Sequence, residues 1–278
     1  MNLKRLFVKH RWSFLLMLFL VLVDAGLSVL YPLFIGFAID DVIIREYTGA
    51  VLLGGLGLLT LVIGSGRRFY DSRFYAKLYR HQGLEVGKSK DQPTSAKTAH
   101  LGFLREVVEF FENSMPEIVN STIGLIGTLL IIATIDLNIF LGCLLILFIV
   151  VMIYGFSQGS IVRYNGAYND EQERQVTALS EDSPILLHHH LWKLMQWNIK
   201  LSDLETLNFS LTWLVMMAFL VYSIISAVGQ GDVTHGAIFS LVLYIFQFME
   251  SVSIMPLFYQ HWLRLTEIIK RLNSTEFA

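Results

Sequence analysis

A glycine, a lysine and a serine stand together in GLEVGKSK, residues 83–90, an order that phosphate-binding loops use. Such a loop has the pattern G-x-x-x-x-G-K-[ST], because a backbone of that length curls its N–H groups around a phosphate between a strand and a helix. Here Gly83 and Gly87 enclose three residues, and the preceding KLYRHQ is typical of a charged helix. Pro93 follows closely enough to disrupt a helix that begins at Lys88. The segment is interpreted as a polar turn at the tip of a helical hairpin.

Two acidic residues lie inside long apolar segments. Asp24 is in VLVDAGLSVL, and Glu250 is in FQFMESVSIMP. An ionisable side chain among lipid tails costs about 3 kcal/mol, so it usually faces protein or water. One hypothesis is that both acids line one cavity and bind a cationic substrate or exchange protons. The other is that each pairs with a donor such as Ser28, Gln247 or a backbone group.

A proline follows Glu250 in the same apolar segment. Pro256 removes a backbone hydrogen bond there, which predicts a bend that suits alternating access and that simple packing explains as well. The candidates for a substrate pathway are Asp24, Gln247, Glu250 and Pro256.

Three consecutive histidines, His188 to His190, form the other cluster with possible chemistry. Adjacent helical residues point about 100° apart, so these side chains cannot converge on one ion as an i, i+4 pair can. Structural or interfacial roles are favoured, and no bound metal or other cofactor is predicted for this chain.

Long apolar helices must position all of these residues. The chain has 278 residues, of which 54% are hydrophobic and 16% are charged, too apolar a balance for a soluble domain. A helix needs about 20 apolar residues to cross the hydrocarbon core. We predict an all-α polytopic membrane protein whose first span is retained rather than cleaved as a signal peptide. Its six predicted transmembrane helices are residues 12–38, 50–66, 118–135, 137–157, 207–228 and 236–258.

The basic residues predict the orientation. Of 21 Lys and Arg residues, only Arg45 falls in an outer loop, so both termini are expected in the cytoplasm. The net charge of −2 points to no particular partner, and no nucleic acid is predicted to bind. The one cysteine, Cys143, excludes an intramolecular disulfide.

The two inner connections, residues 67–117 and 158–206, are long, whereas the outer ones are short. Apolar residues recur every four positions in the first, which predicts helices that continue the spans and pack together. These positions are Tyr70, Phe74 and Leu78, with Tyr75 and Tyr79 beside them, and Phe103, Val107 and Phe111, with Leu104 and Val108. We therefore expect two long cytoplasmic helical hairpins, and a single membrane domain over residues 1–278 because neither a repeat nor a linker divides the chain.

Three stretches carry a resemblance to a family. YPLFIGFAIDDVI at 31–43 is similar to the outer end of the first helix of ABC exporter transmembrane domains, and LTEIIKRLN at 265–273 to their exit from helix six. GDVTHGAIFSLVLYIFQF at 231–248 resembles the family's loop that opens helix six. Within it Thr234 is expected to cap the helix, and Gly236 to allow close packing. The resemblance covers essentially the whole chain.

The resemblance implies a fold, partners and a location. Family members dimerise by exchanging helices, and the tips of their inner hairpins dock on ATPase domains. Here those tips would lie at residues 83–96 and 183–192. The partner-coupling candidates are Glu85, Lys88, Ser89, His188 and Trp192. Export is implied by the family alone, and the expected location is the bacterial inner (plasma) membrane.

The chain departs from the family in one respect that matters for function. It ends at Ala278, and it contains neither a phosphate-binding loop nor an ABC signature motif. The chain is therefore predicted not to be an enzyme, and ATP would act through a partner subunit.

Three hypotheses on function remain. The first is a dimeric transporter subunit with a separate ATPase, favoured by the preserved hairpin length, because long helices are costly to order without a partner. The second is an ATPase-independent carrier, driven by an ion gradient through Asp24 and Glu250, or a binding scaffold. The weak family match at the hairpin tips favours this second hypothesis. The third is a truncation whose ATPase domain has been removed.

Overall fold

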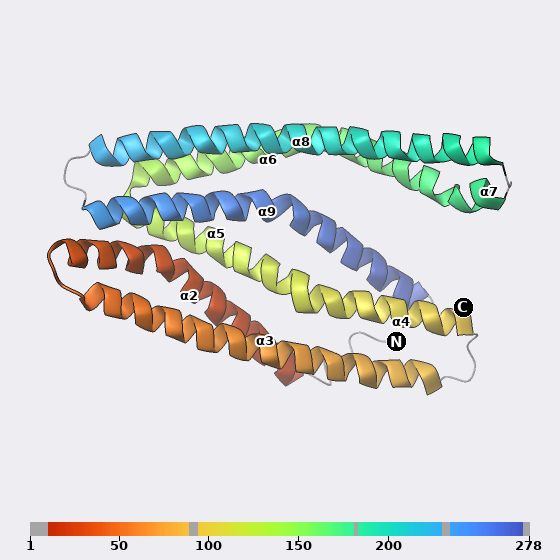
Figure 1. The fold of residues 1–278 in the computed structure, drawn as a ribbon, viewed down its shortest axis with the longest axis horizontal. Helices are drawn as coiled ribbons and strands as arrows, with labels where there is room; N and C mark the ends of the chain where they lie inside the picture. Colours follow the sequence, from red (N-terminus) through yellow and green to blue (C-terminus); the bar gives the residue numbers. More distant parts are fainter. Residues whose placement is uncertain (1–10, 89–93, 181–182, 230–233, 275–278) are drawn as a thin grey trace. The chain divides into compact units, whose positions relative to one another are not determined.

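The computed structural model describes residues 11–88, 94–180, 183–229 and 234–274, and within these ranges the chain is helical without a strand (Figure 1). The side chains of Glu85, of several residues between 94 and 103, of Thr177 and of residues 255–274 lie outside this description. The helices are α2 (Arg11–Ile43), α3 (Thr48–Lys88), α4 (Thr94–Glu109), the π-helix η1 (Phe110–Ser114), α5 (Met115–Ile135), α6 (Leu137–Glu173), α7 (Gln175–Ser180), α8 (Pro184–Gly229) and α9 (His235–Ser274).

Six helical stretches are long and apolar enough to cross a membrane. Each contains all or most of one predicted span, so the prediction of six transmembrane helices is confirmed at the level of length and composition. They are Arg11–Ile43, Thr48–Lys88, Leu104–Ile135, Leu137–Ser180, Pro184–Gly229 and His235–Ile254.

The described helices form two compact units, residues 1–136 with 227–278, and residues 137–226. In unit 1, α2 packs against α3, α5 and α9, and α5 also packs against α9. From Phe14 to Gly36 the buried positions of α2 recur every three or four residues, which is the spacing of a seam that faces neighbouring helices. They are Phe14, Met17, Val21, Ala25, Val29, Pro32, Gly36 and Ala38.

Small residues let α2 and α9 approach each other closely. A Cβ atom on Gly36 would lie 2.6 Å from the backbone oxygen of Gly236 and would also collide with the Ser240 hydroxyl. Such close backbone approach is how helices gain packing energy where lipid offers no hydrophobic driving force. Two hydroxyls of α9 donate across the same interface, from Ser240 to the Pro32 carbonyl at 2.7 Å and from Tyr244 to the Val29 carbonyl at 3.0 Å.

Proline positions coincide with curved helices in unit 1. Pro32 lies inside α2, and Pro256 is the 22nd of the 40 residues of α9. Figure 1 shows both helices bending along their length, and α9 near its middle. A proline inside a helix removes one backbone hydrogen bond and is a common cause of such bends.

The first of the two long connections between predicted spans is built from the end of α3 and from α4. Its buried cluster contains Tyr75, Leu78 and Val108, together with Phe14 and Met17 from α2. Partly buried hydrophobic side chains pack around this cluster, namely Tyr70, Phe74, Phe111 and Met115. Most of the apolar positions that recur every four residues in the sequence thus lie in or around this cluster, whereas Tyr79 is exposed and the Phe103 side chain lies outside the described residues.

The π-helix η1 joins α4 to α5 just before a proline. The Met115 N–H donates to the Phe110 carbonyl, which is one residue wider than the α-helical pattern. Pro116 stands one position later and has no N–H to donate back to Phe111. The Tyr75 hydroxyl of α3 donates to the Phe111 carbonyl at 2.9 Å, so this carbonyl has a side-chain donor in place of the missing N–H.

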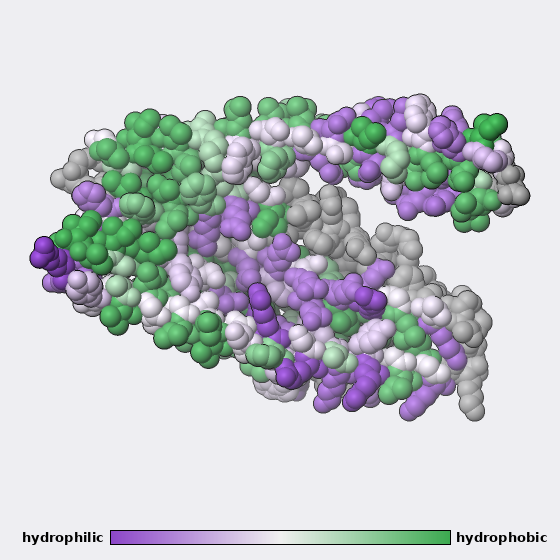
Figure 2. Space-filling view, viewed as in Figure 1, coloured by the Kyte–Doolittle hydropathy of each residue, from purple (hydrophilic) through white to green (hydrophobic). Residues whose placement is uncertain are grey.

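Unit 2 consists of α6, α7 and residues of α8 up to 226. The Phe219 ring packs directly over Gly142, where a Cβ atom would collide with it. Ser157 donates to Asn208 at 2.7 Å, and the ring centroids of Tyr164 and Trp197 lie 6.1 Å apart. Figure 2 shows hydrophobic side chains concentrated at one end of this unit and hydrophilic ones toward the α7 end, as expected if only one end contacts lipid.

Candidate functional site

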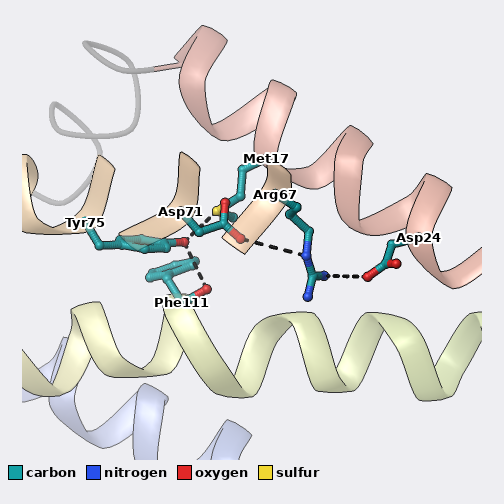
Figure 3. A network of polar contacts seen from close by, with 6 residues as sticks. All are labelled: Met17, Asp24, Arg67, Asp71, Tyr75 and Phe111. Atoms are coloured by element: carbon teal, nitrogen blue, oxygen red, sulfur yellow. Dashed lines mark hydrogen bonds and ion pairs between the residues drawn. The ribbon is translucent and has the colours of Figure 1, made fainter. Parts of the chain in front are cut away.

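Charged side chains meet between α2 and α3 in the interior of unit 1 (Figure 3). Arg67 Nη1 lies 3.5 Å from Asp24 Oδ2, and Arg67 Nε lies 4.0 Å from Asp71 Oδ2. The side chain of Arg67 is only 10% exposed, that of Asp24 16% and that of Asp71 8%. We call Asp24, Arg67 and Asp71 the charge network. Two carboxylates therefore share one guanidinium in a mostly buried place.

Helix geometry explains how the charge network forms. Arg67 and Asp71 are separated by four residues in α3, so they lie on the same face. Gly64, one turn earlier on α3, lies within ordinary contact of the Asp24 carboxylate, since a Cβ atom there would be 3.5 Å from Oδ1. This open position allows the long arginine side chain to extend toward α2.

The charge network is loosely bonded. Arg67 Nε and Nη1 and Asp71 Oδ1 are buried and have no hydrogen-bond partner in the described structure. A buried polar atom without a partner costs roughly 1–3 kcal/mol, so such atoms mark places where a water, a proton or a ligand is expected. The arrangement has the chemistry of an exchangeable site more than that of a rigid structural bridge.

Tyr75 lies one turn beyond Asp71 and extends the polar contacts toward η1. Its hydroxyl lies 2.6 Å from the Met17 sulfur and 2.9 Å from the Phe111 carbonyl (Figure 3). The phenol therefore fixes α3 to both α2 and η1 beside the charge network. Neither Arg67 nor Asp71 was among the sequence candidates, although their i, i+4 spacing directly after an apolar run was a usable signal.

The structure revises the expected partners of Asp24. The Ser28 hydroxyl donates to the backbone carbonyl of Asp24 at 2.9 Å instead of to its carboxylate, which faces Arg67. Glu250 is exposed on α9. The cavity shared by Asp24 and Glu250 stays a prediction.

The other two pathway candidates lie on α9. Gln247 is half-buried, with its Nε2 atom against Gly124 of α5 and its buried Oε1 atom lacking a hydrogen-bond partner. Pro256 falls within the helix, and its side chain lies outside the described set. Their roles in a substrate pathway remain predictions.

A second polar group stands where α2 ends. Asp40 accepts hydrogen bonds from the Gly236 N–H at 2.8 Å and from the Thr234 hydroxyl at 2.6 Å, and Asp41 accepts one from the Gly49 N–H at 2.7 Å. We call these five residues the helix-end clamp. Two adjacent acids thus satisfy backbone donors at the starts of α9 and α3, where the helix dipole also favours a negative charge.

The start of α9 follows the sequence expectation. The Thr234 hydroxyl accepts a hydrogen bond from the Ala237 N–H at 3.2 Å, as a capping residue does. Gly236 packs against Gly36, as its size allows. The role of Asp40 in capping the same helix from another segment was missed, because 196 positions separate it from Gly236.

The partner-coupling candidates lie at or near the hairpin tips. Lys88 is exposed at the last residue of α3, while Ser89 and the Glu85 side chain lie outside the described residues. His188 and Trp192 are exposed on α8. Their role in coupling to a partner stays a prediction.

The histidine run divides by exposure. His190 is buried, and its Nδ1 atom lies 3.0 Å from Glu171 of α6, whereas His188 and His189 are exposed. The same carboxylate lies 3.0 Å from Lys193 Nζ. Across the part of the chain that the structure describes, no three His, Cys, Asp or Glu side chains are grouped as a metal site requires.

Comparison with known protein families places this fold. The profile of the ABC transporter transmembrane region matches residues 3–236, which is most of the chain. The chain belongs to this family. This ABC transporter membrane region is therefore an integral membrane component for transport, and it corresponds to the transmembrane part of such transporters and not to their ATPase domain. The match ends at residue 236, so nearly all of α9 lies beyond the matched residues and is described from the structure. Comparison with curated proteins finds none that matches.

Proposed function

We propose that this chain is the membrane-spanning subunit of an ABC-type transporter, that two membrane domains form the substrate pathway as a homodimer or heterodimer, and that a separate subunit hydrolyses ATP. Membership in the ABC transporter transmembrane region family and six membrane-length helices support this proposal. Export is the preferred direction, because the sequence resembles exporters, and the proposed location is the bacterial inner membrane with cytoplasmic termini.

The observation that supports a separate ATPase subunit is a group of exposed apolar side chains at the tip of unit 2. Val176 of α7 and Ile185 of α8 are 77% and 82% exposed, although they lie far along the chain from the apolar runs of α6 and α8. Leu179 and Leu186 add to the same tip at 58% and 48% exposure. Figure 2 shows hydrophobic side chains among hydrophilic ones at this end. Exposed apolar side chains gathered in a polar region are typical of a protein-binding surface.

Polar contacts between α6 and α8 hold the helices together just below the tip. Glu171 of α6 is 8% exposed and bonds His190 and Lys193 of α8, both at 3.0 Å. Arg174 Nη1 lies 3.8 Å from the same carboxylate. These contacts tie the two helices of the hairpin together near its end, so movement imposed on the tip passes into α6 and α8.

A matched pair of substitutions tests this surface. Ile185→Ser removes an apolar side chain at the tip, and Ile199→Ser removes an equally large one that is 57% exposed further along the same helix. We expect Ile185→Ser to reduce recovery of an ATP-binding subunit with the tagged full chain from native membranes by about tenfold, which corresponds to about 1.4 kcal/mol of contact energy. Ile199→Ser should keep recovery and the associated ATPase activity.

If both variants recover the ATP-binding subunit equally well, the tip is not part of the partner interface. If no ATP-binding subunit co-purifies with the unaltered chain, and the chain alone takes up solute along an ion gradient in liposomes, the ATPase-dependent function fails. An ATPase-independent carrier is then the better function, and the buried charges of the charge network favour it over a passive scaffold.

A further inference from the structure

The charge network carries an excess of negative charge. Asp24 and Asp71 would contribute two negative charges, and Arg67 contributes one positive charge. None of these side chains is more than 16% exposed, so water can compensate the remaining charge only poorly. Burying a charge without compensation costs several kcal/mol, and a group in that position commonly changes its protonation state instead.

The geometry shows which carboxylate is less well compensated. Asp24 Oδ2 lies 3.5 Å from the guanidinium, whereas the closest approach of Asp71 is 4.0 Å. Asp71 Oδ1 is buried and has no hydrogen-bond partner in the described structure. Asp71 therefore has a buried oxygen available to bind a positive charge.

The other ionisable groups around Asp71 strengthen this asymmetry. Arg67 of α3 lies between Asp71 and Asp24 of α2, and the Tyr75 phenol stands one turn further along α3. The charge of Glu112 on η1 also acts on Asp71, and it is of the same sign. Among the described side chains, Arg67 is the cation that the structure pairs with this group, so negative charge prevails around Asp71.

A proton fits this site better than a metal ion does. A metal cation needs several oxygen ligands at short distance and would be repelled by the guanidinium that lies between the two carboxylates. A proton needs one oxygen atom and places no charge next to Arg67 once it is bound. Two carboxylates that share one site commonly retain a single proton for this reason.

We propose that Asp71 binds one exchangeable proton, which leaves Asp24 and Arg67 as a neutral ion pair in the interior of unit 1. The proton is released to water when the site becomes more accessible, because solvation then stabilises the second carboxylate. The protein thereby has a proton-binding site whose occupancy depends on its conformation. This inference concerns residues of this chain alone and requires no ATPase partner.

Infrared spectroscopy of the purified full-length chain in lipid nanodiscs tests the proposal. A protonated buried carboxyl gives a carboxylic C=O stretching band, and the pH at which half of that band has disappeared is the measured quantity. We expect one such band near neutral pH in the unaltered protein, and its loss in Asp71→Asn. Glu46→Gln, which changes an exposed acid in the loop between α2 and α3, should leave the band and its midpoint unchanged.

The direction in which three further substitutions shift the midpoint pH distinguishes this proposal from a merely structural role of the charge network. Asp24→Asn removes a neighbouring negative charge and should lower the midpoint pH, because Arg67 then compensates Asp71 alone. Arg67→Gln removes the positive charge and should raise the midpoint, while Arg67→Lys keeps the charge and should leave it close to that of the unaltered protein.

A band that persists in Asp71→Asn would overturn the assignment. A midpoint that does not move in Asp24→Asn, while Asp71→Asn abolishes the band, would overturn the charge-sharing between the two acids. If Arg67→Gln fails to fold, the pair of Asp24→Asn and Arg67→Lys still decides the outcome, since the proposal expects a shift in the first and none in the second.

Discussion

The helix-end clamp and the charge network both use aspartates of α2, yet they are bonded in different ways. In the clamp, Asp40 accepts two hydrogen bonds at 2.6 and 2.8 Å, one of them from a backbone N–H. In the charge network, Asp24 has a single ion-pair contact at 3.5 Å, and its partner Arg67 retains buried nitrogen atoms without hydrogen bonds.

The difference teaches where a membrane helix can hold an acid firmly. The start of a helix presents backbone N–H groups whose positions are already set, so a carboxylate there has its donors in place. A carboxylate in the middle of a helix has no such donors and depends on a long side chain from another helix. The clamp is therefore expected to be fixed, and the charge network to change its protonation.

Crowding the helix contact beside the clamp should give the largest loss of stability. Gly36→Ala would place a Cβ atom 2.6 Å from the Gly236 carbonyl oxygen, and because that oxygen belongs to the backbone, α9 must shift. We expect a loss of about 2 kcal/mol in the free energy of unfolding. Unfolding by sodium dodecyl sulfate in mixed micelles measures it.

Gly26→Ala is the matched control for this contact. It lies on the same helix, and nothing stands within 4 Å of the added Cβ atom, so the change should be neutral or stabilising. Equal losses in the two variants would mean that the tight crossing of α2 and α9 does not contribute to stability.

Neutralising each aspartate of α2 tests the comparison directly. Asp40→Asn weakens the capping of α9, and we expect it to cost about 1 kcal/mol. Asp24→Asn should cost less than about 0.5 kcal/mol, because Asp71 then releases its proton and becomes the counter-ion of Arg67. The same unfolding measurement applies to both, and a larger loss for Asp24→Asn would reverse the order of the two regions.

Removing the phenol hydroxyl beside the charge network should cost less than Asp40→Asn does. Tyr75→Phe removes the hydroxyl that donates to the Phe111 carbonyl at 2.9 Å, for a loss of about 0.5–1 kcal/mol in the free energy of unfolding. Tyr79→Phe on the next turn of α3 is the control, since that side chain is 36% exposed. No difference between the two would show that the π-helix turn does not depend on Tyr75.

Sequence patterns located much of the fold and part of the polar chemistry. The six apolar runs, the cap at Thr234 and the close contact at Gly236 are local features, and the structure contains all three. The acid at position 24 was found because a charge in an apolar run is conspicuous. Its partner was not found, because 43 positions separate Arg67 from Asp24, and their contact depends on how α3 packs against α2.

The histidines also show that helical spacing does not predict which residues become buried when helices pack. Helical spacing predicted that His188, His189 and His190 would point in different directions, but not which of them would be buried. The packing of α6 against α8 decides that His190 faces Glu171 and that the other two are exposed.

The sequence by itself determined six membrane-length helices and the cap at the start of α9, because hydrophobic run length and cap residues act over one helix at a time, whereas the family follows from the match over residues 3–236. Only the tertiary structure decided that Asp40 caps a helix almost 200 residues away and that Asp24 shares Arg67 with Asp71. Such contacts follow from which faces of two helices meet, and no periodicity within either helix specifies that.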